Sequence, residues 1–230
     1  MTIKLNGSTA GSVALDAPAS TTGNADIAFK LPVADGSAGQ VLKTDGSGNL
    51  SWVTVADTND CVKLASSNVS PADATFTYDS LDNSTYHYYK LIWQGVSNVD
   101  NTTLKFRWRT GGADITDNLY NWTNIGITGA GTIYDNGAQS SDEALIFYAA
   151  GNQPGEGWNL ELTMKPQQAQ PSSGSSVWTT GDRFDSDGTS FRGERNQMRL
   201  KKNVSPNGFH IYPASGTFAQ YQYTLYGFKK

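Results

Sequence analysis

Few side chains in this sequence could act as metal ligands, nucleophiles or proton carriers. There are two histidines, His87 and His210, and neither has a metal-ligating residue two or four positions later. The one cysteine, Cys61, excludes an internal disulfide and a cysteine-based metal cluster, and we expect it to be a small buried side chain. No HExxH, phosphate-binding loop or GxSxG motif occurs. We therefore predict that the protein is not an enzyme and holds no cofactor.

Carboxylates are the remaining candidates for chemistry. Asp182, Asp185 and Asp187 lie together in GDRFDSDG, and carboxylates beside glycine suit Ca²⁺. Their spacing differs from that of an EF-hand loop, so we expect a solvated turn and predict no metal site. A carboxylate pair for glycoside hydrolysis cannot be recognised from spacing, because its two acids usually lie on different strands.

Aromatic side chains in polar segments suggest stacking on sugar rings. Residues 110–143 and 166–196 are rich in Gly, Asn, Asp and Ser, and we expect both to be long connections. The alternative is that their aromatics tuck under the ends of the domain or into a subunit interface. The candidate receptor-binding residues are Tyr120, Trp122, Tyr134, Trp178 and Phe184.

Charge is unevenly placed along the chain. The net charge is −4, yet residues 181–230 hold eight basic and four acidic groups. The basic run FRGERNQMRLKK is typical of a solvated strand face, or else of a patch for an anionic polysaccharide or nucleic acid. A pI near 5.1 argues against a dedicated nucleic-acid binder. Apolar stretches such as residues 144–150 are far shorter than the ~20 residues that span a bilayer, so no membrane insertion is expected.

The elements that position these side chains are predicted to be strands. Residues 61–230 hold 24 of the 26 aromatics, and residues 103–109 and 158–165 alternate apolar and polar side chains. No stretch shows a sustained helical period. We count eight or nine strands, the others being at 76–79, 86–94, 144–149, 176–179, 197–202, 209–212 and 220–228. Two stacked antiparallel sheets, a jelly-roll-like β-sandwich, are the natural way to bury these faces.

Residues 1–60 differ in composition and cannot bury their own apolar side chains. Short strands are expected at 3–6, 12–15, 26–31, 40–43 and 49–55, separated by Gly-rich turns that supply no second layer. Such a segment either stays flexible or buries these faces against other copies, and three chains around one axis would cover both the faces and their strand edges. We predict a trimerising stalk or docking segment at 1–60 and a sandwich head at 61–230. The candidate trimer-interface residues are Ile27, Phe29, Leu31, Val41, Leu50 and Trp52.

Residues 31–55, LPVADGSAGQVLKTDGSGNLSWVTV, resemble a motif of fibre and appendage proteins of tailed bacteriophages, marine phages especially. The ending YQYTLYGFKK, residues 221–230, is similar to the final strand of many such proteins. The resemblance implies an external virion component, usually a homotrimer, that contacts other virion proteins through its N-terminal segment. It assigns no catalytic residue. Only thirty residues precede the motif, so a receptor-binding fibre, a capsid decoration or head fibre, and an adaptor subunit remain alternatives.

The leading hypothesis is a non-enzymatic homotrimeric virion fibre whose head binds a host-surface glycan. A second hypothesis is a capsid decoration protein that binds no host. A third is a glycan depolymerase tip, which the short length and the lack of a recognisable acid/base pair disfavour.

Overall fold

The computed structural model describes residues 3–6, 9–15, 18–55, 59–69, 75–153, 155–167, 174–184 and 190–230. The chain divides into two compact units, Met1–Thr58 and Asn59–Lys230. Among the described residues, the one helical segment is a single 3-10 turn at Thr22–Asn24. The all-β fold class is therefore confirmed.

The N-terminal unit consists of two small antiparallel hairpins. Strands β1 (Ile3–Asn6) and β2 (Ser12–Leu15) form the first, and β3 (Gln40–Thr44) and β4 (Leu50–Thr54) form the second. Asp45 organises the turn between β3 and β4, because its carboxylate accepts hydrogen bonds from the backbone N–H groups of Ser47 (2.7 Å) and Asn49 (3.1 Å).

The strand expected at 26–31 does not form. Only Lys30 pairs, through an isolated parallel bridge to Asn49. The indole of Trp52 donates a hydrogen bond to the Ala34 carbonyl at 2.9 Å, and its ring covers Gly36. This contact holds the 31–39 segment as an irregular loop over β4. None of the side chains of this unit whose exposure the structure describes is buried.

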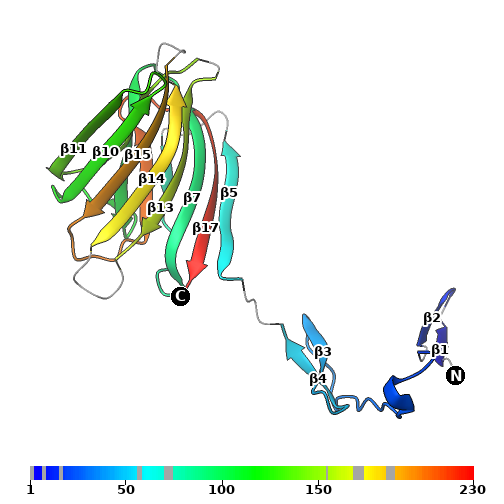
Figure 1. The fold of residues 1–230 in the computed structure, drawn as a ribbon. Helices are drawn as coiled ribbons and strands as arrows, with labels where there is room; N and C mark the ends of the chain where they lie inside the picture. The colour runs from blue at the N-terminus through cyan, green and yellow to red at the C-terminus, as the bar shows by residue number, and fades with distance from the viewer. Residues whose placement is uncertain are drawn as a thin grey trace. The chain divides into compact units, whose positions relative to one another are not determined.

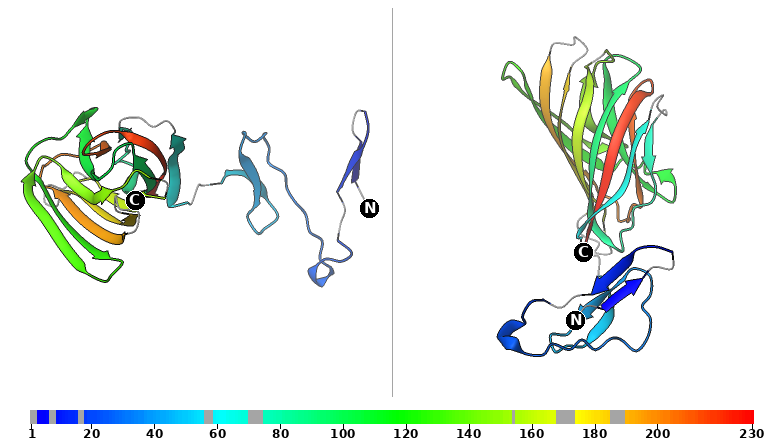
Figure 2. Two further views of the ribbon diagram at one scale, coloured as in Figure 1. Left: turned by 90° about the horizontal axis from the view of Figure 1, so that it is seen from above. Right: turned by 90° about the vertical axis from the view of Figure 1, so that its right-hand side faces the viewer.

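The C-terminal unit is a sandwich of two antiparallel sheets (Figure 1). The larger sheet has the order β11-β10-β15-β14-β13-β7-β17-β5, and the smaller has the order β12-β8-β16-β6, with β9 paired to β8. Figure 2 shows the two layers from two further directions. Strand bounds are β5 Cys61–Val69, β6 Phe76–Tyr78, β7 Tyr86–Ser97, β8 Thr102–Thr110, β9 Ala113–Asp114, β10 Tyr120–Thr128, β11 Ile133–Ser141, β12 Ala144–Ala150, β13 Gly157–Lys165, β14 Ser175–Phe184, β15 Phe191–Leu200, β16 Gly208–Pro213 and β17 Phe218–Lys229.

The core lies between the two sheets and is built by alternation. On β13, Trp158, Leu160, Leu162 and Met164 are buried while the residues between them face outward. The same rule buries alternate positions of β8 and β7, and β12 from the small sheet packs over the middle strands of the large one. One contiguous cluster of apolar side chains results.

The strand order is compatible with a jelly roll. Strands β6, β8, β12 and β16 form the small sheet, and β7, β10, β11 and β15 lie in the large one, so the chain crosses repeatedly between the two layers. The hairpin β13–β14 is inserted between β7 and β15. Strands β17 and β5 extend the sheet on the other side of β7. These additions make the large sheet wide enough to offer a long solvent-facing surface.

Residues 110–143 and 166–196 are not long connections as expected. They contain β9, β10 and β11, the whole of β14, of which only 176–179 was expected, and the start of β15. With β5, which was not expected either, the described part of the head has thirteen strands rather than eight or nine. The apolar alternation fails there because inward positions are polar. Asn124 of β10 points inward and donates a hydrogen bond to buried Glu194 of β15, at 3.0 Å.

Candidate functional site

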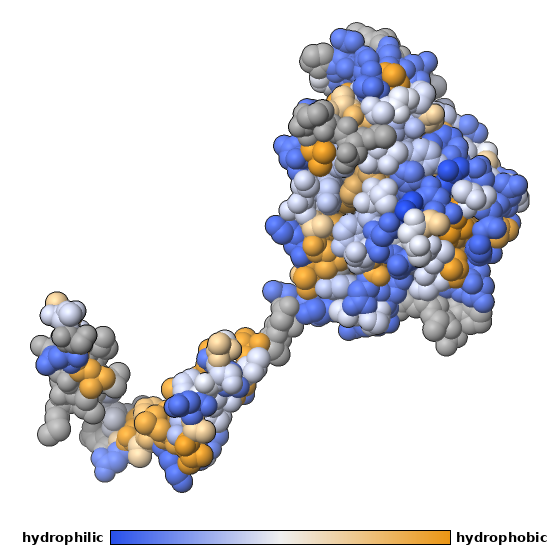
Figure 3. Space-filling view, turned by 180° about the vertical axis from the view of Figure 1, so that it is seen from behind, coloured by the Kyte–Doolittle hydropathy of each residue, from blue (hydrophilic) through white to orange (hydrophobic). Residues whose placement is uncertain are grey.

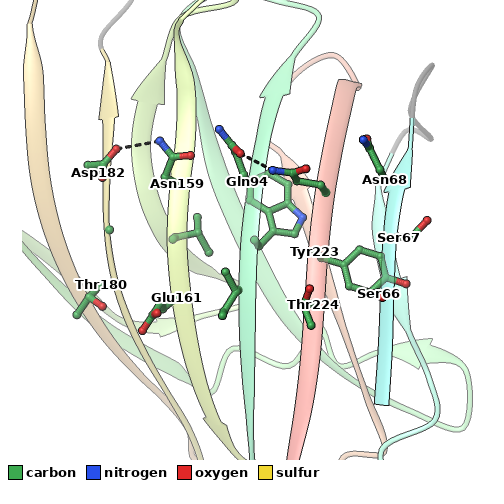
Figure 4. Close-up of a pocket in the computed structure, with 15 residues that line it drawn as sticks. Ser66, Ser67, Asn68, Gln94, Asn159, Glu161, Thr180, Asp182, Tyr223 and Thr224 are labelled. Carbon is green, nitrogen blue, oxygen red and sulfur yellow. Dashed lines mark hydrogen bonds between the residues drawn. The ribbon is translucent and has the colours of Figure 1, made fainter. Parts of the chain in front are cut away.

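The solvent face of the large sheet carries a row of amide and carboxylate side chains. The registers place one such residue on each of five neighbouring strands, β5, β17, β7, β13 and β14. Strand spacing of ~4.8 Å gives the row a length of about 19 Å. Figure 4 shows four of its members at one level across the strands. This amide row consists of Asn68, Gln222, Gln94, Asn159 and Asp182.

Hydrogen bonds orient two pairs within the amide row. The Gln222 side-chain amide donates to the Gln94 carbonyl oxygen at 2.6 Å, and the Asn159 amide donates to Asp182 at 3.0 Å (Figure 4). Each of the three amide groups still has donor or acceptor positions that these bonds do not use. The row is therefore ordered and can still bind a ligand.

A second row runs parallel to the first, two residues away from it on each strand. Its members, in register across the same five strands, are Ser66, Thr224, Ile92, Glu161 and Thr180. Together the two rows line an open groove of about 800 Å³. The Glu161 carboxylate is ion-paired with Lys90 at 2.8 Å.

A second hollow, of about 660 Å³, adjoins this groove, and Thr180 lines both. It lies over β14, β15 and β10 and is lined by Trp178, Arg195 and Ile125 among others. The Trp178 side chain is 40% exposed and makes no ring contact with another aromatic in the described chain. We call the groove and this hollow together the polar strip.

The five predicted receptor-binding aromatics do not lie together. Only Trp178 lines the polar strip. Tyr120 is fully buried and cannot contact a receptor, which corrects the expectation from sequence. Its hydroxyl accepts a hydrogen bond from the Trp108 backbone N–H at 2.9 Å and donates one to the Ile115 carbonyl at 3.0 Å.

Tyr134, Trp122 and Phe184 are engaged in packing. The Tyr134 hydroxyl donates to Glu194 at 2.6 Å, and burial together with this bond raises the pKa of Tyr134 to about 12. Trp122 packs against the core. Phe184 contacts Phe191 edge-to-face, with the ring centres 5.5 Å apart. All three lie on strands rather than in the loops expected from sequence.

The candidate trimer-interface residues lie at the surface of the N-terminal unit, where Figure 3 shows apolar side chains among the outer atoms. Phe29 is 65% and Leu31 69% exposed, and Ile27, Val41 and Trp52 are exposed as well, while Leu50 is half-buried. Their role in a trimer stays a prediction.

The other candidate side chains that the structure describes, Asp182, Cys61 and His210, lie on three different strands. Asp182 belongs to the amide row, and Asp185 and Asp187 lie outside the described residues. Cys61 is exposed rather than buried, because it begins β5 at the edge of the large sheet. His210 lies 2.8 Å from Asp114 through Nδ1, on the outer face of the small sheet. The described residues contain no group of three or more His, Cys, Asp or Glu side chains that could hold a metal ion.

The side chains of the basic run at 191–202 point alternately into the sandwich and out to solvent along β15. Glu194 is buried, whereas Arg195 and Arg199 face solvent on the large sheet. Within the part of the chain that the structure describes, neither arginine makes an ion pair. Inside the sandwich, Glu194 receives a hydrogen bond from the Arg183 guanidinium at 2.5 Å.

Sequence reasoning missed the amide row. Asn68, Gln94, Asn159 and Gln222 are far apart in sequence and unremarkable one by one; only the strand registers bring them together. The only sign of the amide row in the sequence was that the outward positions of the predicted strands at 86–94, 158–165 and 220–228 carry amide side chains.

No described helix is long and apolar enough to cross a membrane. No protein-family model matches the chain, and neither a curated protein nor a solved structure matches it.

Proposed function

We propose that this protein is a non-enzymatic, self-associating appendage protein of a phage virion whose sandwich binds a cell-surface glycan along the polar strip. The main observation in support of glycan binding is the amide row with its neighbouring hydroxyl groups. Amides and hydroxyls both donate and accept hydrogen bonds, as sugar hydroxyls do. Ile92 and Trp178 add apolar faces against which a sugar ring can lie.

The carboxylates of the polar strip favour binding over hydrolysis. Glycoside hydrolysis needs a general acid whose pKa is raised, which burial provides. Glu161 is exposed and ion-paired with Lys90, and Asp182 accepts a hydrogen bond from Asn159. Neither carboxylate has the apolar surroundings that a general acid requires.

The N-terminal unit supports the assembly part of the proposal. It exposes Phe29 and Leu31, and none of its side chains whose exposure the structure describes is buried. Three copies covering these faces would present three strips at once, and weak sites gain strength on a repetitive glycan through avidity. The resemblance of residues 31–55 to phage fibres supports a place on the virion.

Binding of the full chain to an array of immobilised bacterial polysaccharides tests this function. We expect at least one polysaccharide to bind, and the double substitution Gln94→Ala/Asn159→Ala to weaken that binding at least tenfold. Asn118→Ala, an exposed amide far from the strip in the 116–119 turn, is the control and should bind as the unaltered protein does. Absence of binding to every polysaccharide would contradict the proposal and favour a capsid decoration protein.

A further inference from the structure

The structure assigns a chemical class to the glycan: we propose that it is acidic, and that a sugar carboxylate binds Arg195 while the same or an adjacent ring lies on Trp178. This inference rests on the proposed function, because it names the ligand of the polar strip.

Trp178 and Arg195 are close neighbours on adjacent strands. The register pairs Trp178 with Gln197 and Thr180 with Arg195, so Arg195 lies diagonally across from Trp178 on the same face. Diagonal neighbours on a sheet are within reach of long side chains. Both side chains line the hollow of about 660 Å³, so a single sugar unit seated there can contact the indole and the guanidinium together.

The guanidinium of Arg195 is not bound by a protein carboxylate in the described chain. It makes no ion pair within the described chain, and its register neighbours Thr180 and Ile125 are uncharged. Asp182 is the other diagonal neighbour of Arg195 on β14, but its carboxylate accepts a hydrogen bond from Asn159 of β13 and forms no ion pair with Arg195. Of the more distant acids on this face, Glu161 is paired with Lys90, and Asp135 lies beyond Ile125 on β11. The planar guanidinium offers two parallel N–H donors that match the two oxygens of a carboxylate.

The rest of the polar strip is suited to uncharged sugars. From Thr180 the groove continues over β13, β7, β17 and β5, where the amide row supplies side chains that can bind hydroxyl groups. A polymer that alternates acidic and neutral sugars would place its carboxylate at Arg195 and its neutral rings along the amide row. Charge complementarity at one end and hydrogen bonding at the other thus favour an acidic heteropolysaccharide.

The test uses the full chain and every polysaccharide bound on the array, each also prepared in its carboxyl-reduced form. We expect the bound polysaccharides to contain uronic-type acids, and carboxyl reduction to weaken binding about tenfold to a hundredfold, the range of a charge-assisted hydrogen-bond pair. Arg195→Gln should cause the same loss on the native polysaccharide and no further loss on the reduced one. Trp178→Ala should weaken binding to both forms.

Arg199→Gln is the matched control. It removes the same charge from the same strand and face, but Arg199 lines a different hollow, beside Trp122. It should bind as the unaltered protein does, and an equal loss in both arginine variants would indicate general charge attraction and overturn the proposal. Binding that survives carboxyl reduction, or that depends on a phosphate or sulfate ester instead, would also overturn it. Neutral polysaccharides that bind and respond to Gln94→Ala/Asn159→Ala would overturn the acidic class alone and leave the proposed function intact.

Discussion

Asp82 shows how one exposed side chain organises the start of a long strand. It lies just before β7, and its carboxylate accepts hydrogen bonds from the Ser84 hydroxyl, from the Ser84 backbone N–H at 3.0 Å and from the Thr85 backbone N–H at 3.3 Å. These donors favour the charged form, the Ser84 hydroxyl most of all. They lower the pKa of Asp82 from 3.8 to about 2.

This lowered pKa predicts a contribution of Asp82 to acid stability. The folded chain binds the Asp82 proton more weakly than the unfolded chain does, so the stabilisation is present above about pH 4 and is lost as pH falls towards about 2. Urea unfolding followed by tryptophan fluorescence should show Asp82→Asn as less stable at pH 7, with the difference shrinking between pH 4 and pH 2. Asp60→Asn, which removes the same charge at an exposed position just before β5, is the matched control for loss of a carboxylate. A difference that stays constant with pH would contradict the prediction.

Among the elements, the hairpin β13–β14 widens the large sheet by joining β15 to β7, and a glycine allows its two strands to pack closely. Gly181 of β14 lies opposite Leu160 of β13, where a Cβ would be 2.1 Å from the Asn159 carbonyl oxygen. Gly193, on the next strand, has no atom within 4 Å of its Cβ position. The same residue type is thus required at one position and optional at the other.

Alanine at these two glycines should have opposite outcomes. Gly181→Ala forces β13 and β14 apart and should destabilise the sandwich by about 1–3 kcal/mol, as overpacking of a filled position does. Gly193→Ala meets open space and should leave stability unchanged or raise it by up to about 1 kcal/mol. Urea midpoints of the two variants measure this contrast, and equal midpoints would contradict it.

Alternation in sequence predicted the strands that line an apolar core but not those with polar interiors. Residues 103–109 and 158–165 are strands as expected, since water faces one side and the core the other. Strand β10 and the first part of β15 place Asn124 and Glu194 inward, where hydrogen bonds replace apolar packing and erase the pattern. The second part of β15 keeps the alternation and was expected at 197–202. The edge strand β11 is polar almost throughout.

The candidate site was predictable only in part. Trp178 was identified because an aromatic residue in a polar segment stands out. Tyr120 and Tyr134 stood out equally, and their hydrogen bonds to Trp108 and Glu194 belong to the fold. Members of the amide row come from strands separated by as much as the whole head, so their adjacency depends on registers that no local pattern contains.

Across the whole chain, the N-terminal unit exposes large apolar side chains such as Phe29 and Leu31, whereas the head encloses a contiguous cluster of buried apolar side chains. We predict a homotrimer of full-length chains with a mass of three times 24.8 kDa in sedimentation or light scattering. Phe29→Ser/Leu31→Ser should shift the mass towards one chain, because it removes two of the most exposed apolar side chains. Asp26→Ser, a nearby exposed position, should leave the mass unchanged. A single-chain mass for the unaltered protein at micromolar concentration would contradict the trimer.

Strand β17, which comes last of the described strands, lies between β7 and β5 in the large sheet. Until Phe218–Lys229 has left the ribosome, β5 has no neighbour and β7 keeps an unpaired edge, although both were synthesised well over a hundred residues earlier. Contacts so distant in sequence form slowly. Until then, the unpaired strand edges of a nascent chain are free to pair with those of neighbouring copies. We therefore expect a stop codon placed before β17 to yield insoluble protein rather than a shortened, folded head.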